Sequence, residues 1–508
     1  MTTFAKRRRH GCVPIIVARF HLPKLMFLAR LQSMSFLSWA SLAWRTISQI
    51  FVFPQCPDTI DQYPLTQEQL DNKRQAFIDS IDQDAVRTLA SRYNNEEPCR
   101  IFNSNNGSFN ACFFVEFLHS RTRWVVRIPI DPIIYDVWTK LQSEVMTMRY
   151  ITDKTTIPLP RIHAYGRGER LIRDSPTTQA FLIIDFVPGQ PLDLHALAND
   201  VPGRRRHFHS QLIEVMAQLR QLEFATAGSL MPDREGGSEP AMGNMLSIPI
   251  NELELDRSET RPPPIFDSAT SFALHQHQLM SEAYQLPRSE LSRETAELEL
   301  FALNHLRQLI PKLIAPECDG GPFVLCHSDL RPTNIIVDND LNIRSIIDWE
   351  WAYTIPRQFF VPPSWITEQD VNCNTFLDFR ETLHAKSVSS DLGCQLAREW
   401  GSDLDTLILP LAEILRNHSN LIHIYYKFVF PQSFQKSRDE VIAGFFQGSG
   451  KTSKNYALAV QQRITDSERY TQYLKDNGLY MPDEEARQAR EWLEKARQLQ
   501  EKMGIKNL

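Results

Sequence analysis

The amino-acid sequence predicts an α+β protein of two lobes, with a small β-rich N-lobe and a larger, mostly helical C-lobe. Two observations support this class: β-rich runs gather between residues 101 and 190, and helical patterns predominate after them. Of the 508 residues, 42% are hydrophobic and 23% are charged, a balance that allows a sizeable buried core. We expect four parts: a basic N-terminal extension (1–64), the N-lobe (65–190), the C-lobe (191–440) and a C-terminal helical extension (441–508).

The first part of the chain is a basic leader. Residues 1–57 hold eight Lys or Arg side chains and no acidic residue, whereas the rest of the chain has 47 bases against 61 acids. A basic, apolar, Ser-containing leader is typical of a mitochondrial transit peptide, and an untargeted extension is an equal alternative. We therefore expect a cytoplasmic or mitochondrial, intracellular protein. The longest uncharged apolar run, Leu31 to Trp44, is 14 residues long and too short for an integral membrane span.

The charge and the cysteines exclude several classes of protein. A net charge of −6 does not suit a dedicated nucleic-acid binder, which needs a basic excess. The eight cysteines form no C-x-x-C pair and no Cys/His cluster with zinc spacing. This pattern predicts scattered thiols in a reducing compartment and no structural zinc.

The elements of the N-lobe follow from local patterns. Residues 65–92 are predicted to be helical, and residues 102–110 (FNSNNGSFN) have turn chemistry. Two β-rich runs, ACFFVEF and RTRWVVRIP, then form a hairpin. The Asp131-Pro132 pair supplies an N-cap and first turn for an amphipathic helix through Ile151. The segment after this helix, residues 157–166, contains two prolines and suits an edge strand. Residues 180–189 are predicted to form a buried strand that ends in a turn.

The C-lobe is predicted to be mainly helical. Helices are expected around residues 212–222 and 293–314, with a long surface excursion at residues 231–264 between them. Residues 323–348 contain three short β-rich runs, the last two separated by the turn DNDLN. The segment GFFQGSGKTS at 444–453 nearly matches a P-loop, but Phe445 stands where the motif needs glycine. We expect a Gly-rich loop between helices there.

The chemistry-bearing motif runs from His327 to Asn334 as H-x-D-x-x-x-x-N, and Asp348 follows 14 residues later. Phosphoryl transfer needs a carboxylate that accepts or orients the proton of the attacking hydroxyl, and amide and carboxylate oxygens that hold Mg²⁺. Asp329 suits the first role, and Asn334 and Asp348 suit the second. A tight hairpin between Asn334 and Asp348 would bring them to one end of a small sheet. The alternative is ordinary turn chemistry.

These segments resemble a known family. CHSDLRPTNIIVD followed by IIDWE resembles the catalytic and metal-binding segments of aminoglycoside phosphotransferases and choline kinase-like enzymes, and is most similar to fungal members. The resemblance covers roughly residues 90 to 365. It implies a bilobal protein-kinase-like fold, with ATP and Mg²⁺ as cofactors. It also implies transfer of the γ-phosphate to a hydroxyl of a small-molecule substrate.

The resemblance extends to nucleotide-binding residues in the N-lobe. NNGSFNACFFVEF resembles the nucleotide loop, WVVRIP the strand with the phosphate-binding base, and AFLIIDFVPG the hinge that meets adenine. The residues that it assigns to nucleotide binding are Gly107, Ser108, Arg127 with its partner Glu144, Asp185 and Val187, with Asn110 as a further phosphate donor.

The chain departs from the family pattern at two positions. Arg127 stands where lysine is usual, and the nucleotide loop has the single glycine Gly107. The plainer interpretations are a structural ion pair for Arg127 and a simple hairpin turn for Gly107. These departures leave a pseudokinase-like nucleotide-binding interaction protein as the alternative function.

Four residues in or beside the motif are given supporting roles. His327 is expected to order the catalytic loop rather than to act as a base. Glu350 is expected to be solvated or to cap a turn, with a position near the metal as the alternative. The flanking Trp349 and Trp351 are expected to pack in the core, with a position lining the substrate side as the alternative.

Overall fold

A computed structural model describes residues 63–481, except for 234–236, 238, 256–263, 368–372, 390 and 404–406. Contacts divide the chain into two units, residues 1–59 and 60–508, and the described residues all belong to the second. The possible transit peptide in residues 1–57 therefore lies outside the described residues. So does the part of the C-terminal extension beyond residue 481.

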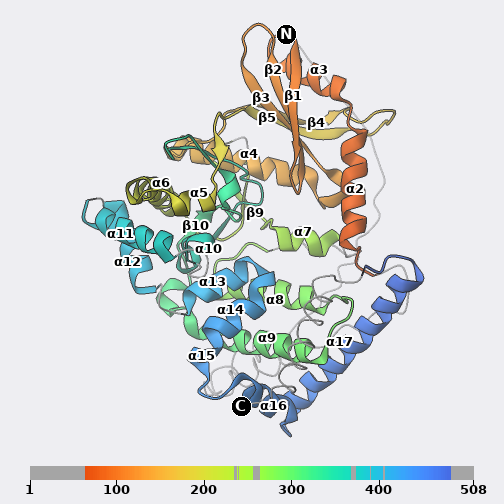
Figure 1. The fold of residues 1–508 in the computed structure, drawn as a ribbon, viewed down its shortest axis with the longest axis vertical. Coiled ribbons are helices and arrows are strands. Elements are labelled where there is room, and N and C mark those ends of the chain that lie inside the picture. Colours follow the sequence, from red (N-terminus) through yellow and green to blue (C-terminus); the bar gives the residue numbers. More distant parts are fainter. Residues whose placement is uncertain are drawn as a thin grey trace, which may run out of the picture. The chain divides into compact units, whose positions relative to one another are not determined.

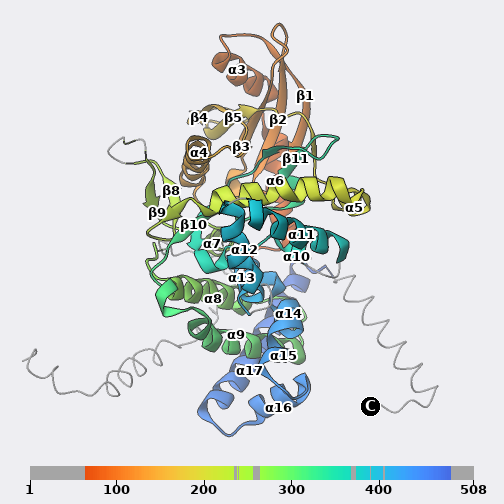
Figure 2. The same cartoon turned by 90° about the vertical axis from the view of Figure 1, so that its left-hand side faces the viewer.

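The N-lobe is built on a five-stranded antiparallel sheet with the strand order β1-β2-β3-β5-β4. Its α4 helix packs against the sheet, as Figures 1 and 2 show, because Leu141 and Val145 share a buried cluster with Leu182 and Ile184 of β5. The elements are α2 (Gln67–Ser80), α3 (Gln83–Tyr93), β1 (Cys99–Asn106), β2 (Asn110–Phe117), β3 (Arg123–Pro129), α4 (Val137–Lys154), β4 (Ile162–Glu169) and β5 (Gln179–Asp185).

The first strand corrects one sequence-based expectation. Residues 102–106 were predicted to form a turn, but they continue β1, whose pairing with β2 runs from Cys99 opposite Phe117 to Asn106 opposite Ala111. The turn is confined to residues 107–109. Most of β1 is exposed at the sheet edge. Polar side chains are therefore tolerated there, because backbone pairing rather than burial holds the strand.

The helix after β3 starts later than predicted. Asp131 begins a separate 3-10 turn (Asp131–Ile133), and Asp136 is the residue that caps α4, accepting a hydrogen bond from the N–H of Thr139 at 3.0 Å. The predicted apolar stripe through Ile151 is buried. The edge strand expected at residues 157–166 is β4, which begins at Ile162, after both prolines of that segment.

The C-lobe is mostly helical, with three small antiparallel sheets of order β13-β10-β7, β12-β11-β6 and β8-β9. Its helices are α5 (Leu194–Asn199), α6 (Pro202–Arg220), α7 (Ile248–Leu255), α8 (Ala269–Gln285), α9 (Arg293–Leu313), α10 (Ser364–Thr367), α11 (Cys373–Ser389), α12 (Asp391–Asp403), α13 (Ile408–Arg416), α14 (Leu421–Ile424), α15 (Phe430–Ser433), α16 (Arg438–Gln447) and α17 (Lys451–Asp476). Its strands are β6 (Gln190–Pro191), β7 (Glu223–Phe224), β8 (Ser229–Met231), β9 (Ala241–Gly243), β10 (Phe323–Cys326), β11 (Ile335–Val337), β12 (Ile343–Ile346) and β13 (Tyr353–Pro356).

The segment 231–264 is not the surface excursion that its composition predicted. Its described residues form β9 and the helix α7, which buries Ile250 and Leu253 in the core. Asn251 of α7 also donates a hydrogen bond from Nδ2 to the carbonyl of Ile133 at 3.1 Å, so the segment is tied to the N-lobe. The remainder of this segment lies outside the described residues.

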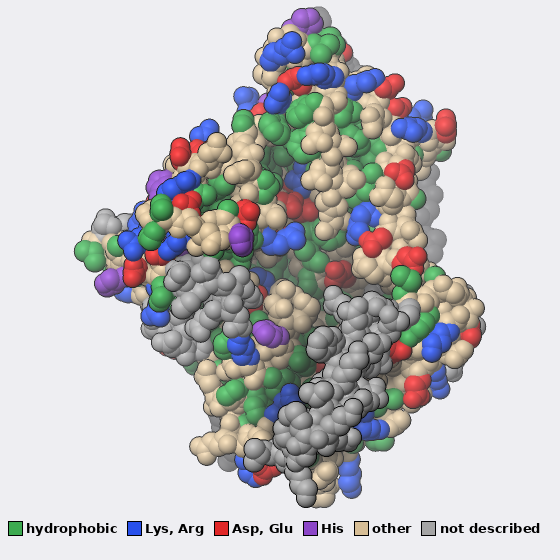
Figure 3. Space-filling model, viewed as in Figure 1, with side chains coloured by type: hydrophobic (Ala, Val, Ile, Leu, Met, Phe, Trp, Pro, Cys, Tyr) green, Lys and Arg blue, Asp and Glu red, His purple; other side chains and the backbone are tan. Residues whose placement is uncertain are grey.

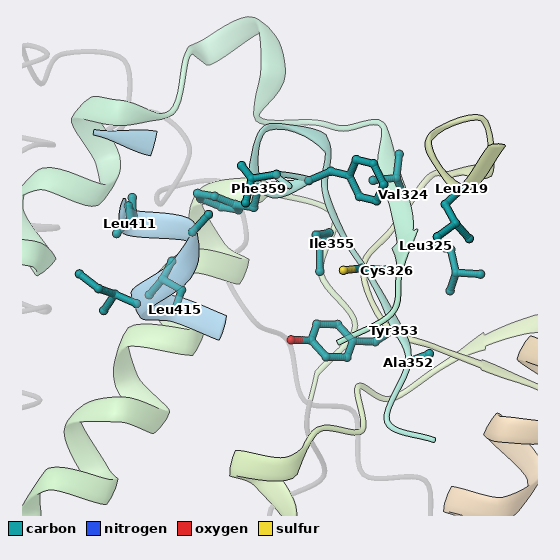
Figure 4. Close-up of a cluster of buried hydrophobic side chains, with 14 of the residues drawn as sticks. Leu219, Val324, Leu325, Cys326, Ala352, Tyr353, Ile355, Phe359, Leu411 and Leu415 are labelled. Carbon is teal, nitrogen blue, oxygen red and sulfur yellow. The ribbon is translucent and has the colours of Figure 1, made fainter. Parts of the chain in front are cut away.

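One buried cluster joins the lobes around the strands that lead into the predicted catalytic loop. Figure 4 shows part of it, with Leu325 of β10, Tyr353 and Ile355 of β13, and Leu411 and Leu415 of α13. Residues 448–450 of the P-loop-like segment form a loop between α16 and α17, as expected, whereas its two ends belong to those helices. No helix in the described part of the chain is long and apolar enough to cross a membrane.

Candidate active site

The H-x-D-x-x-x-x-N segment forms a loop between β10 and β11 that is held by internal hydrogen bonds. The ring of His327 is buried, and its Nε2 donates to the carbonyl of Ile347 at 2.9 Å. Its Nδ1 accepts from the N–H of Asp329 at 3.3 Å. Burial lowers the pKa of His327, which keeps the ring neutral. These contacts place His327 between the loop and the segment that carries Asp348.

Asp329 and Asn334 lie at the two ends of this loop and are directly connected. Asn334 is buried, and its Nδ2 donates to the carbonyl oxygen of Asp329 at 2.9 Å. The backbone of Asn334 in turn accepts from the N–H of Ile347 at 2.9 Å. The Oδ1 of Asn334 therefore remains an acceptor close to the segment that leads to Asp348.

The Asp329 carboxylate is partly exposed and has a cationic neighbour. Its side chain is 27% exposed and forms an ion pair with Arg331 at 2.7 Å, and Arg331 itself is 59% exposed. Reasoning from the sequence did not assign Arg331 a role. An exposed arginine at this position can swing away without loss of packing, so the pair does not block access to Asp329.

Asp348 is held against the N-lobe by Arg127. The Asp348 backbone has a φ of 67°, in the left-handed region that few residues other than glycine adopt. Its Oδ1 accepts from a guanidinium nitrogen of Arg127 at 2.9 Å. Arg127, on β3, also pairs with Glu144 on α4, and both of these side chains are buried. The predicted Arg127–Glu144 pair is thus extended by a third member from the C-lobe.

Three carboxylates surround the Arg127 guanidinium. Glu144 and Asp348 bind it directly, and an oxygen of Glu350 lies 3.7 Å away. Burial by itself would lower the pKa of Arg127, but the three carboxylates together raise it well above its ordinary value. The arginine is therefore charged in the absence of nucleotide. Its guanidinium contacts Glu144 and Asp348 at the same time through different nitrogens, which the single ammonium of a lysine could not reproduce.

Glu350 is not the solvated or capping residue that was expected. Its side chain is buried, pairs with the buried Lys140 of α4, and accepts from Nδ2 of Asn110 at 2.7 Å. Asn110 was predicted to donate to phosphate, but its side-chain amide N–H donates to Glu350 instead. Lys140 lies one helical turn before Glu144, so a second cation–carboxylate bridge runs beside the first. The spacing of four residues between Lys140 and Glu144, which puts both on one face of α4, was the only sequence feature that pointed to this second bridge.

Both tryptophans beside Asp348 are buried, as expected. The Nε1 of Trp349 donates to the carbonyl of Ile346 at 3.0 Å. Trp351 packs edge-on against Phe109 from the β1–β2 loop, with ring centroids 5.2 Å apart. The Lys140 ammonium lies 5.2 Å from the centre of the Trp351 ring. The turn that carries Asp348 is thus packed against the end of the β1–β2 loop.

The tip of the β1–β2 loop is exposed and makes few contacts. Gly107 donates its N–H to the carbonyl of Asn110 at 2.9 Å, as in a hairpin turn, and Ser108 is exposed beside it. A Cβ on Gly107 would meet that same carbonyl at 3.7 Å, an ordinary contact. The protein backbone therefore does not require glycine at this position.

The predicted hinge follows β5 and crosses between the lobes. The N–H of Asp185 is taken by the carbonyl of Arg161 at 3.0 Å, and the Asp185 carboxylate contacts Nε2 of His163 at 2.6 Å. The N–H of Val187 has no hydrogen-bond partner within the described residues. Gly189 has a φ of 145°, and a Cβ there would lie 2.7 Å from the carbonyl oxygen of Val337. Glycine is required at this crossing.

The assigned residues thus converge from both lobes. Arg127, Glu144, Asp348 and Glu350 form one charged cluster, and Asn334 joins Asp329 to it through Ile347. Figure 3 shows acidic and basic side chains side by side in the recessed centre of one face. Gly107, Ser108, Asp185 and Val187 do not take part in this cluster.

Comparisons with known proteins identify a family and several distant relatives. The model of the "Phosphotransferase enzyme family" matches residues 105–359. Clavilactone A biosynthesis cluster protein Y of Ampulloclitocybe clavipes is 25% identical over 248 residues, which is 47% of this chain and 57% of that protein. The mitochondrial protein "Altered inheritance of mitochondria protein 9" of Eremothecium gossypii is 21% identical over 337 residues, covering 55% and 54%. The solved ethanolamine kinase of Plasmodium vivax superposes with a TM-score of 0.36 at 14% identity, covering 86% and 96%. The matches thus span little more than half the length of these two curated relatives.

Proposed function

Because the chain belongs to the phosphotransferase enzyme family and has its bilobal protein-kinase-like fold, we propose that it transfers the γ-phosphate of ATP to a hydroxyl of a small molecule. The observation that carries this proposal is the connection of Asp329 and Asn334 to Asp348 and Arg127. Phosphoryl transfer depends on positioning and charge neutralisation, and this arrangement supplies both.

The residues in the site suit a magnesium ion. The Nδ2 of Asn334 is committed to Asp329, which leaves its Oδ1 as an acceptor, and Asp348 offers a carboxylate that is 28% exposed. Amide and carboxylate oxygens are the ligands that Mg²⁺ prefers, with water and phosphate completing its shell. When bound, the ion would neutralise charge on the nucleotide phosphates.

The remaining roles fall to side chains on either side of this pair. Asp329 orients the acceptor hydroxyl and takes its proton, since its carboxylate is accessible once Arg331 moves aside. Arg127 holds the nucleotide phosphates while Glu144 keeps its guanidinium in place. The exposed tip with Gly107 and Ser108 lies over the phosphates, and the hinge at Asp185 to Val187 receives the base.

The proposal is tested by ATP turnover against a panel of hydroxyl compounds, with Asp329→Asn as the matched variant. We expect turnover with at least one acceptor and a loss of about a hundredfold or more in Asp329→Asn. Nucleotide binding should be retained in this variant, because Asp329 makes no proposed contact with the nucleotide. Nucleotide binding without turnover on any acceptor would refute the enzyme assignment.

A pseudokinase-like nucleotide-binding interaction protein is the second candidate. The observation in its favour is that Arg127 is already neutralised by Glu144 and Asp348, so nucleotide phosphates must compete with both carboxylates. The turnover experiment separates the two candidates. A pseudokinase binds nucleotide and leaves every acceptor unmodified.

A mitochondrial location is proposed separately, on the basic leader and on the mitochondrial designation of one relative. Residues 1–57 fused to a fluorescent reporter should direct it to mitochondria. A diffuse cytosolic signal would remove this proposal and leave the catalytic one unaffected.

A further inference from the structure

The β1–β2 loop is fastened to the C-lobe at its β2 end, although its tip is exposed. Gly107 and Ser108 at the tip lie in solvent, and Gly107 makes only a hairpin hydrogen bond, to the carbonyl of Asn110. Asn110, the first residue of β2, is in contrast only 5% exposed. Its Nδ2 donates to an oxygen of Glu350 at 2.7 Å, across 240 residues of sequence. The loop is therefore held by the residue that follows its tip.

A second contact fastens the same end of the loop. The ring of Phe109 packs edge-on against Trp351, with ring centroids 5.2 Å apart. Both rings belong to a small apolar cluster with Ile130 and Ile133. The carbonyl of Phe109 also accepts from the N–H of Ile130 at 2.9 Å, so its backbone is fixed as well as its side chain. Two consecutive residues of the loop end thus contact the same short segment of the C-lobe, residues 348–351.

The segment that receives these contacts carries the groups assigned to the metal and the phosphates. Asp348 lies two residues before Glu350 and accepts from Nη2 of Arg127 at 2.9 Å. The Glu350 oxygen that accepts from Asn110 lies 3.7 Å from that same Arg127 nitrogen. The end of the loop is therefore one side chain away from the proposed phosphate-binding cation.

The hydrogen bond from Asn110 is not needed to neutralise the charge of Glu350. The buried ammonium of Lys140 already supplies the countercharge, and the two side chains are 2% and 6% exposed. Asn110 is a neutral donor, so its contribution is directional: it fixes where β2 begins relative to Glu350. Removing it leaves no unpaired charge, which makes Asn110 a suitable position for substitution.

We propose that Asn110 and Phe109 are positioning residues, which hold the tip of the β1–β2 loop over the nucleotide phosphates by binding the segment that carries Asp348. This rests on the proposed phosphotransferase function, because it requires a nucleotide in the cleft. Three residues of chain span at most about 11 Å, so a fixed Asn110 keeps the N–H groups of the tip near Arg127. A loop that is ordered before the nucleotide arrives loses less conformational entropy on binding. The contacts of Asn110 and Phe109, rather than additional glycines, would then set the position of the loop.

The test compares a non-hydrolysable ATP analogue with adenosine, which has the same base and sugar but no phosphates. Their affinities for the full-length protein are measured by calorimetry in the presence of Mg²⁺. For Asn110→Ala we expect the analogue to bind about tenfold more weakly, as for the loss of one hydrogen bond to a charged group, and adenosine to bind as before. Phe109→Ala should change the two affinities in the same way. The matched control is Asn103→Ala, because Asn103 is exposed on β1 and its Oδ1 accepts from the N–H of the adjacent Ser104. Neither affinity should change in this control.

Two further variants distinguish a loss of positioning from a loss of folding. Asn110→Asp places a carboxylate against Glu350 and should weaken binding of the analogue more than Asn110→Ala does. Asn110→Asp combined with Glu350→Gln exchanges the amide and the carboxylate across the same contact and leaves one carboxylate beside Lys140. This double variant should recover most of the affinity that Asn110→Asp loses.

Three results would overturn the positioning role. The first is an equal loss of affinity for the analogue and for adenosine in Asn110→Ala, which indicates a general defect of the fold. The second is tighter binding of the analogue in Asn110→Ala, which indicates that the contact closes the site. The third is a double variant that binds the analogue no better than Asn110→Asp.

ATP turnover separates this inference from the proposed function. Turnover on an acceptor, with analogue binding that does not depend on Asn110, would refute the positioning role and leave the kinase assignment standing. Analogue binding that depends on Asn110, without turnover on any acceptor, would refute the kinase assignment and keep the positioning role. If the unsubstituted protein does not bind the analogue, both are wrong.

Discussion

The buried bridge between Lys140 and Glu350 leads to the most specific prediction. Lys140 is 2% exposed and Glu350 is 6% exposed, so neither charge is screened by solvent. Removing one partner of such a pair leaves a stranded charge and costs about 3–5 kcal/mol. For Lys140→Met we expect a loss of stability at the lower end of this range, because Glu350 keeps its hydrogen bond from Asn110. For Glu350→Gln we expect a loss of stability at the upper end of this range, because the Lys140 ammonium then lies near Arg127 without a carboxylate partner of its own.

The double variant Lys140→Met/Glu350→Gln strands no charge and should be destabilised by only about 1 kcal/mol. Urea unfolding of the four proteins gives the coupling free energy, which these losses put at about 7 kcal/mol. The exposed pair of Lys436 and Glu440 serves as the matched control, and neutralising it should have no measurable effect. If the effects of Lys140→Met and Glu350→Gln add to within about 0.5 kcal/mol, the two residues do not form a bridge in solution.

Three further predictions concern the metal, the response to acid and the P-loop-like segment. Asp348→Ala should abolish Mg²⁺-dependent nucleotide binding measured with a fluorescent analogue, and unchanged binding would contradict the metal role. Burial lowers the pKa of His209 to about 4, so this ring is neutral in the folded protein while the unfolded chain takes up a proton below its ordinary pKa of about 6.5. The free energy of unfolding should therefore fall by roughly 3 kcal/mol for this group between pH 6.5 and 4. In urea titrations, the free energy of unfolding of His209→Leu should depend less steeply on pH. An equally steep dependence would refute the assignment of this acid sensitivity to His209. Lys451→Ala should leave nucleotide affinity unchanged, since Lys451 is exposed at the start of α17, and any weakening would revive the P-loop interpretation.

Patterns confined to short segments predicted their elements well. The apolar stripe through Leu141, Val145 and Met148 identified α4, because burial on one face repeats with the helical period. The hairpin of β2 and β3 and the loop between α16 and α17 were predicted for similar reasons. The errors arose where burial was decided by distant residues. Residues 102–106 form a strand because β2 pairs with them, and α7 is buried because the core extends over it.

The sequence by itself determined the chemistry available to this protein. Asp329, Asn334 and Asp348, with a hairpin between the last two, already predicted a carboxylate and two metal-binding oxygens at one end of a small sheet. Only the tertiary structure decided which charges neutralise one another. Glu350 was expected in solvent but is buried, because Lys140 and Asn110 approach it from 210 and 240 residues away. The energy of burying a charge depends on partners in space, and a linear sequence does not reveal which partners the fold will supply.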